Sequence, residues 1–191
     1  MKYMTPELLA RFRSKDDDTA ETAASEWERQ GTEYKARLQE IQARPDLPRG
    51  VRKLLKRDRL HDAKVLTMAT EAGTHFFSFI VELPWQTDPA KKHYELQYRL
   101  VGGTGKGLVL KQHEILKGDG KPFGWWLYDE IDLIDGKVEA YTHSVLLTGG
   151  WEVQLTFFSL AWRRLNFLFP PTNSEGVVGP KEVARWEKQI A

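Results

Sequence analysis

The sequence predicts a single α+β domain in which N-terminal helices pack on a curved or barrel-like antiparallel sheet of about seven strands. Apolar residues recur at the helical period through about residue 60, and beyond His61 they alternate with period two. Short turns separate the alternating segments, and they join antiparallel neighbours because parallel strands need long crossovers. We therefore divide the chain of 191 residues into a helical segment, 1–60, a β meander, 61–169, and a tail, 170–191.

Two helices are expected in the first part of the helical segment. Thr5-Pro6-Glu7 combines a hydroxyl N-cap, a proline at the first helical position and an acid beside the helix dipole, which predicts a helix start. A second helix is expected to begin at the capping box Asp18-Thr19-Ala20-Glu21 and to continue to about Arg44, where a proline stops it. Its apolar stripe includes Trp27 and Tyr34, so one face is buried against the rest of the chain or a second copy.

A third, short helix, expected over 48–58, has a basic face. Its five cations are Arg49, Arg52, Lys53, Lys56 and Arg57. Such a stripe can follow the phosphates of a nucleic acid. However, one helix offers few contacts, and no aromatic residue interleaves with the cations, so the pattern is more typical of a solvated helix face. Nucleic-acid binding through this face is therefore the third functional hypothesis.

Seven strands are expected in the β meander. They are 64–72, 75–83, 93–101, 107–116, 124–134, 137–147 and 151–163. Because short turns connect them, each should pair with the next, in a sheet that curls into a barrel or is covered by helices. The glycine-rich loop 101–107 lacks two residues of a phosphate-binding loop and precedes a strand, so we interpret it as a hairpin turn. In the tail, a short helix is expected over 180–190.

Composition excludes several classes of protein. The chain has no cysteine, which excludes disulfides, thiolate catalysis and thiolate metal sites. Its net charge of +1 steers no particular partner. No apolar run approaches a membrane span, and the N-terminus lacks the apolar core of a signal peptide. We therefore expect a cytoplasmic protein that does not enter a membrane.

The pair His61-Asp62 lies where the helices give way to the sheet. A histidine beside an aspartate can act as an oriented base or as two metal ligands. The remaining histidines fall on separate predicted strands without the spacing of a metal site, so no metal or cofactor is expected. The pattern favours a structural role, in which Asp62 caps backbone at the turn and His61 packs against the sheet.

The stretch FGWWLYDEIDL, residues 123–133, crowds acids among aromatic and aliphatic residues. Period two divides it into two faces, one with Trp125, Leu127, Asp129, Ile131 and Leu133, the other with Trp126, Tyr128, Glu130 and Asp132. Asp129 is the anomaly, because a carboxylate among aliphatic residues must be paired, hydrogen-bonded or protonated. The expected partners of Asp129 are His61, Arg99, His143 and Arg163.

Two interpretations of Asp129 stay open. It can be an acid of perturbed pKa that lines an aromatic pocket. Alternatively, it is part of the scaffold, either turned toward solvent by a β-bulge or held in a structural ion pair. The pattern slightly favours the scaffold interpretation.

The two faces of this strand predict different functions. An aromatic and acidic surface of Trp126, Tyr128, Glu130 and Asp132 suits a basic protein partner, so the leading hypothesis is a non-enzymatic protein-binding module. The alternative is a hydrolase-like enzyme or a small-ligand binder. Its candidate residues are His61, Asp62, Asp129, Glu130 and His143. The sequence leaves open whether any catalysis occurs, and it does not give the oligomeric state.

Three stretches behind the helical segment also carry a resemblance. They are Leu60-His61-Asp62-Ala63-Lys64-Val65, Trp126-Leu127-Tyr128-Asp129-Glu130-Ile131, and His143-Ser144-Val145-Leu146-Leu147 running into Gly150-Trp151-Glu152-Val153. With them the chain resembles uncharacterised bacterial domain-of-unknown-function families, and it is weakly similar to small β-domains proposed as immunity proteins of bacterial toxin systems. The resemblance implies a bacterial cytoplasmic protein and supplies no catalytic residues.

Overall fold

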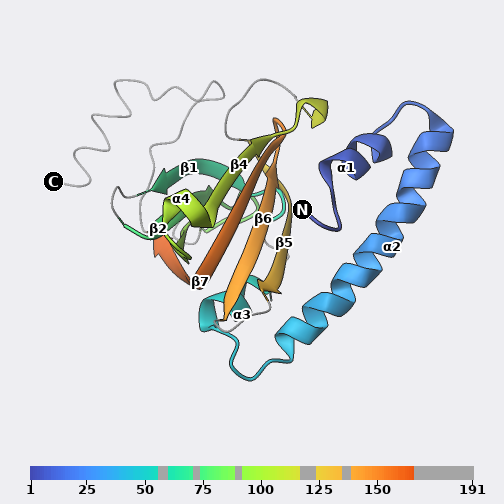
Figure 1. Ribbon diagram of the computed structural model, residues 1–191. Helices are drawn as coiled ribbons and strands as arrows, with labels where there is room; N and C mark the ends of the chain where they lie inside the picture. Colours follow the sequence, from blue (N-terminus) through green and yellow to red (C-terminus); the bar gives the residue numbers. More distant parts are fainter. Residues whose placement is uncertain (56–59, 71–73, 89–91, 117–123, 135–138, 166–191) are drawn as a thin grey trace, which may run out of the picture.

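A computed structural model describes residues 1–55, 60–70, 74–88, 92–116, 124–134 and 139–165. The predicted α+β class is confirmed, because helices flank a curled antiparallel sheet of seven strands (Figure 1). The predicted tail helix over 180–190, and Lys56 and Arg57 of the basic face, lie outside the described residues.

Three helices form the N-terminal part of the fold: α1 (Pro6–Phe12), α2 (Asp17–Gln42) and α3 (Arg49–Leu55). Thr5 caps α1 as predicted, since its Oγ1 accepts the N–H of Leu8 at 3.2 Å. Helix α2 begins earlier than expected, because Asp16 is the N-cap and its carboxylate accepts the N–H of Thr19 at 3.0 Å. The capping box at Asp18 is therefore inside the first turn.

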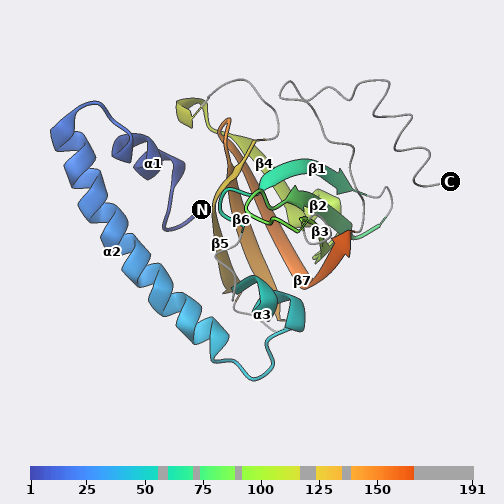
Figure 2. The same ribbon diagram turned by 180° about the vertical axis from the view of Figure 1, so that it is seen from behind.

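Helices α1 and α2 lie together beside one edge of the sheet (Figures 1 and 2). The ring of Phe12 stacks on Trp27 with centroids 5.6 Å apart, and Trp27 meets Tyr128 of the sheet edge-on at 4.9 Å. Tyr34, about two turns further along the same stripe, also reaches the sheet, where its hydroxyl accepts the N–H of Ile131 at 2.7 Å. The aromatic members of the predicted apolar stripe therefore attach α2 to the sheet of the same chain.

All seven predicted strands are present. They are β1 (Lys64–Thr70), β2 (Phe76–Glu82), β3 (His93–Leu100), β4 (Leu108–Gln112), β5 (Trp126–Ile134), β6 (Ala140–Leu147) and β7 (Trp151–Leu165). Every pairing between them is antiparallel. A helical turn, α4 (Thr104–Gly107), precedes β4, and a 3-10 turn, η2 (Glu114–Leu116), follows it.

The predicted meander is wrong in its strand order, which is β1-β2-β3-β7-β6-β5, with β4 also paired to β7. Strand β7 is 15 residues long, so its first part pairs with β4 and its last part with β3. Because β3 and β4 both run antiparallel to β7, they point in the same direction and lie one after the other along it. The loop 101–107 is therefore not a hairpin turn: α4 and Gly102 and Gly103, both with positive φ, carry the chain onward.

The sheet curls until the start of β1 meets the start of β5. The N–H of Asp62 donates to the carbonyl of Trp126, and the N–H of Trp126 donates to the carbonyl of Ala63, both at 2.8 Å. A bridge between Lys64 and Trp125 continues this contact. The core fills the inside of the curl, and its largest fully buried side chains are Trp126, Tyr98, Tyr141, Phe79 and Phe157.

Helix α3 packs on β7 at one end of the curl. Gly50 permits this contact, because a Cβ at that position would lie 1.5 Å from the carbonyl oxygen of Leu160. The indole N–H of Trp162 donates to the carbonyl of Gly50 at 3.2 Å. The end of α2, helix α3 and the start of β5 thus surround one region of the sheet, where the candidate site lies.

Candidate functional site

A β-bulge in β5 decides which side chains face inward. Trp126 pairs with Leu147 and Tyr128 with Leu146, so the strand has one extra residue, Leu127, between them. The bulge reverses the predicted faces at the start of the strand: Trp126 is fully buried in the core, whereas Trp125 is 43% exposed. The expectation that Trp126 belongs to an exposed binding surface is therefore wrong.

Asp129 joins Trp126 on the inner side, and its partner there is His143. The Nε2 of His143 lies 2.9 Å from one carboxylate oxygen of Asp129, and the indole N–H of Trp126 donates to the other oxygen, also at 2.9 Å. Tyr98 continues the network, with its hydroxyl 2.8 Å from the Nδ1 of His143. Of the four predicted partners, the one that binds Asp129 is thus the histidine on the neighbouring strand β6.

The Tyr98 hydroxyl stays protonated within this network. Burial raises the pKa of Tyr98 well above its ordinary value, and the charge of Asp129 adds to this effect. The phenol therefore keeps its proton and is available to bond Nδ1 of His143, while a proton on Nε2 of His143 donates to the Asp129 carboxylate. Tyr98 and His143 are fully buried, so they hold the carboxylate from behind.

Asp129 also faces a cavity, which the scaffold interpretation did not require. The cavity has a volume of about 600 Å³, and the side chain of Asp129 is 28% exposed. We call it the Asp129 cavity. Within the described ranges its lining residues are Tyr34, Leu38, Leu54, Leu55, Leu60, His61, Asp62, Trp85, Leu127, Tyr128, Asp129 and Ile131. The enzyme or small-ligand hypothesis required His61, Asp62 and Asp129 to share one pocket, and they do.

His61 and Asp62 lie at the solvent-exposed rim of this cavity. The Nδ1 of His61 is 3.0 Å from the Asp62 carboxylate, and the His61 ring meets Tyr128 edge-on at 5.4 Å. Asp62 has a φ of +62°, a left-handed conformation that is uncommon outside glycine and is tolerated best by Asn and Asp. The backbone contact with Trp126 holds this conformation, so the pair is fixed relative to β5.

Tyr34 is a polar group of the cavity wall that sequence reasoning did not single out. Its hydroxyl accepts the N–H of Ile131, and burial, followed by the charge of Asp129, raises its pKa. The hydroxyl thus stays protonated. One feature of the sequence does indicate Tyr34 and Tyr98, because each hydroxyl interrupts an otherwise apolar face of its helix or strand.

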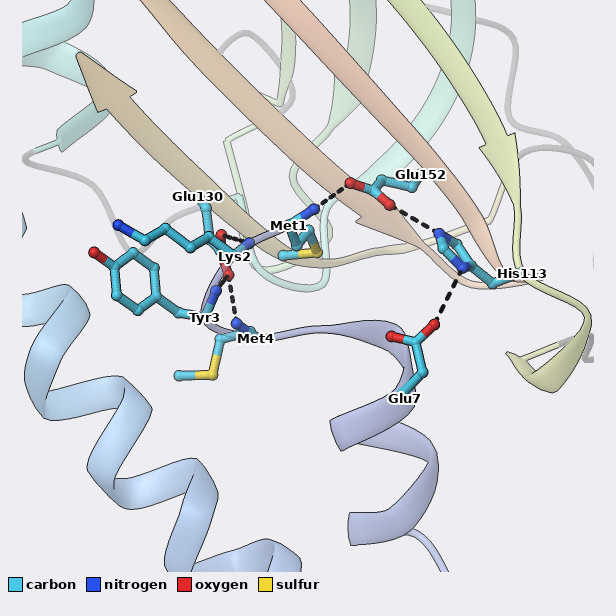
Figure 3. Close-up of polar contacts among 8 residues, drawn as sticks. All are labelled: Met1, Lys2, Tyr3, Met4, Glu7, His113, Glu130 and Glu152. Carbon is cyan, nitrogen blue, oxygen red and sulfur yellow. Dashed lines mark hydrogen bonds and ion pairs between the residues drawn. The ribbon is translucent and has the colours of Figure 1, made fainter. Parts of the chain in front are cut away.

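The outward face of β5 is covered by the chain's own N-terminus. Residues 1–5, which we call the strap, run along it, and Glu130 accepts backbone N–H groups from the strap (Figure 3). The donors are Lys2 at 2.6 Å, Tyr3 at 2.9 Å and Met4. Glu130 is 6% exposed and does not line the Asp129 cavity, so the expectation that it lies on an exposed binding surface is wrong.

The other residues of the predicted binding surface are also engaged within the chain. Asp132 lies 2.7 Å from the guanidinium of Arg37 on α2, and the Tyr128 ring contacts the rings of His61 and Trp27. Sequence reasoning placed these side chains on the correct face of the strand. It did not predict that the strap and α2 would cover that face, because the covering segments come from more than 90 residues away along the chain.

A buried ion pair attaches the start of the strap to β7. The ammonium of Met1 contacts the carboxylate of Glu152, whose other oxygen is 2.8 Å from Nε2 of His113 (Figure 3). Glu7 lies on the far side of His113, 3.9 Å from its Nδ1. Burial by itself would raise the pKa of Glu152, but the bonds from the Met1 ammonium and His113 lower it overall. No local pattern in the sequence indicated this pair.

The basic face of α3 is partly used inside the fold. Arg52 donates to the backbone carbonyls of Pro45 at 3.3 Å and Leu47 at 3.4 Å. The ammonium of Lys53 lies 5.0 Å from the centre of the Trp162 ring. Nucleic-acid binding through this face stays a prediction, and these two cations already have contacts within the chain.

Comparison with known proteins adds no assignment. The chain matches no protein-family model and no curated protein sequence. The resemblance to uncharacterised bacterial families therefore stays a prediction. Within the described ranges, no group of three or more His, Cys, Asp or Glu residues is placed to hold a metal ion. None of the described helices is long and apolar enough to cross a membrane.

Proposed function

We propose that the protein binds a small organic molecule in the Asp129 cavity. The observation that carries this proposal is the state of Asp129, which two donors from the protein hold in place while part of its carboxylate faces a cavity. Part of this carboxylate stays accessible from the cavity although each of its oxygens already has a protein partner. A carboxylate that is both fixed and accessible is pre-organised to contact a ligand.

The size and composition of the cavity support this function. Ligand sites commonly have volumes of about 300–1,000 Å³ and combine apolar walls with a few placed polar groups. The Asp129 cavity, at about 600 Å³, lies within this range. Leu38 of α2 and Leu54 of α3 supply apolar wall, while Tyr34, His61 and Asp129 supply polar groups.

The leading hypothesis from the sequence, a protein-binding module, finds less support. It relied on the outward face of β5, where Glu130 now binds the strap and Asp132 pairs with Arg37. A partner could reach this face only by displacing contacts that the chain makes with itself. Binding of a protein partner through another surface stays a prediction.

Catalysis is the second candidate function of the same cavity. His61 and Asp62 at the rim, with Asp129 deeper in the wall, place groups that can accept a proton near a bound molecule. His143 is behind Asp129, where it orients the carboxylate rather than touching a ligand. If the ligand is recovered chemically unchanged after long incubation with the protein, the binding function stands without catalysis.

A screen against cavity-filling variants tests the proposal. We would screen a fragment library by ligand-observed NMR against the natural protein, Leu38→Trp and Leu110→Trp. Leu38 lines the cavity, whereas Leu110 is 48% exposed on β4, so the second variant is a matched control for the same substitution. We expect fragments that bind the natural protein and Leu110→Trp but not Leu38→Trp. If no fragment binds, or if every binder ignores Leu38→Trp, the proposal is wrong.

A further inference from the structure

We infer that the ligand of the Asp129 cavity is a small organic cation, a molecule with an alkylammonium group. This inference rests on the proposed function and adds the chemical class of the ligand. Three properties of the cavity carry it: the charge of its wall, the aromatic rings in the wall, and the fixed orientation of the Asp129 carboxylate.

Among the described residues of the wall, the charged groups are predominantly acidic. Asp129 and Asp62 both line the cavity, and within the described part of the chain no Lys or Arg lines it. His61 is the basic side chain among the described lining residues, and it is already bonded to Asp62. A cation entering this space meets carboxylates, whereas an anionic ligand would be repelled by them.

Three aromatic rings add to the preference for a cation. Tyr34, Trp85 and Tyr128 come from three different parts of the chain and line the same space. The faces of aromatic rings attract ammonium groups, and sites for quaternary ammonium ligands are commonly built from several such rings. Tyr128 contacts the rings of both His61 and Trp27, so its position in the wall is fixed.

The carboxylate of Asp129 retains acceptor capacity for a ligand. An ionised carboxylate offers about four acceptor positions, and the protein occupies one on each oxygen. Because the donors are the indole of Trp126 and the imidazole of His143, both buried, the carboxylate does not need to reorganise when a ligand binds. An ammonium group can therefore contact an acid whose orientation is already set.

Three ligands of one shape test the inference. Choline is the cation, dimethylbutanol is its neutral isostere with a quaternary carbon in place of nitrogen, and tert-butylacetate is the anionic counterpart. Dissociation constants would be measured by NMR titration of the full chain. We expect choline to bind at least about tenfold more tightly than dimethylbutanol, the difference made by one favourable charge interaction of moderate strength. Binding of tert-butylacetate should be weaker still.

Variants of the wall provide the second part of the test. Asp129→Asn should weaken choline binding about tenfold and leave dimethylbutanol binding nearly unchanged. The asparagine fits the network, because its NH₂ can donate to Nε2 of His143 if the imidazole proton moves to Nδ1 and bonds Tyr98. Trp85→Leu should weaken choline binding about two- to fivefold. Trp125→Leu is the matched control, as Trp125 is similarly exposed, at 43% against 40%, and does not line the cavity.

The outcomes separate this inference from the proposed function. If dimethylbutanol or tert-butylacetate binds as tightly as choline, and Leu38→Trp abolishes that binding, the cavity is a ligand site but not one for cations. If none of the three ligands binds while other library fragments bind in a Leu38-dependent way, the inferred class is also overturned. If no fragment binds at all, the proposed function fails with it.

Discussion

Removing the Glu130 carboxylate should release the strap from the sheet. Glu130 accepts three backbone N–H groups, from Lys2, Tyr3 and Met4, and is itself 6% exposed. In Glu130→Ala these donors lose their partner, and water cannot fully replace it, because the contact with Tyr3 is buried. The variant should therefore be destabilised, and the segment that opens first should be the strap.

The size of the effect follows from the three contacts. A hydrogen bond to a charged group contributes about 1.5–3 kcal/mol, but bonds to one acceptor are not additive. The strap can also detach and let water solvate its N–H groups, which limits the loss. We therefore expect Glu130→Ala to lower the free energy of unfolding by about 2–4 kcal/mol, and Glu130→Gln, which keeps an acceptor oxygen, by about 1–2 kcal/mol.

Urea unfolding and amide hydrogen exchange measure this prediction. The amides of Lys2, Tyr3 and Met4 should lose protection in Glu130→Ala. The control is Glu33→Gln, which removes an exposed ion pair with Arg29 on α2 and should change the free energy of unfolding by less than about 0.5 kcal/mol. If Glu130→Ala matches this control and the strap amides stay protected, the assignment of Glu130 as the anchor of the strap is wrong.

Three further predictions concern other contacts. The folded state lowers the pKa of Glu152 below its ordinary 4.5, so the ionised carboxylate stabilises the fold above that pH and loses its contribution as the pH falls through the folded-state pKa. In urea unfolding, the stability difference between the natural protein and Glu152→Gln should therefore shrink from about pH 6 to about pH 3. A difference that stays constant over this range would contradict the prediction. Tyr98→Phe removes the bond to His143 and should cost about 1–2 kcal/mol by the same method, whereas no loss would show that the bond does not contribute. Gly50→Ala should lower the thermal midpoint by several degrees more than Gly105→Ala, because a Cβ at Gly50 meets the backbone of Leu160 and one at Gly105 meets nothing within 4 Å; equal midpoints would contradict the close approach of α3.

Local signals in the sequence predicted the helices and strands, and non-local contacts account for the main errors. Alternation predicted the seven strands, because side chains on the two faces of a strand alternate along its sequence and the two faces differ in polarity. Strand order depends on the length of β7, which is great enough to pair with β3 and β4 in succession. Nothing in the loop 101–107 alone indicates that the chain continues along β7 instead of turning back.

In the candidate site, too, the features that follow from the local strand pattern were predictable, whereas those that depend on distant residues were not. Asp129 was recognisable as an anomaly, and His143 was among its expected partners, because both follow from the strand pattern. The bulge at Leu127 was not predictable from alternation, and it exchanged the positions of Trp125 and Trp126. The burial of Glu130 depends on the strap, which is 126 to 128 residues away in sequence.

The indole N–H of Trp126 provides the most direct test of ligand binding at Asp129. This group donates to the Asp129 carboxylate at 2.9 Å, so its ¹H–¹⁵N resonance reports on that carboxylate. The indole of Trp162, bonded to Gly50, is an internal reference, and Asp129→Asn identifies the Trp126 resonance. We predict that choline shifts the Trp126 resonance in a saturable manner and leaves that of Trp162 in place. A Trp126 resonance that stays unchanged while choline binds would contradict the assignment of Asp129 as the ligand anchor.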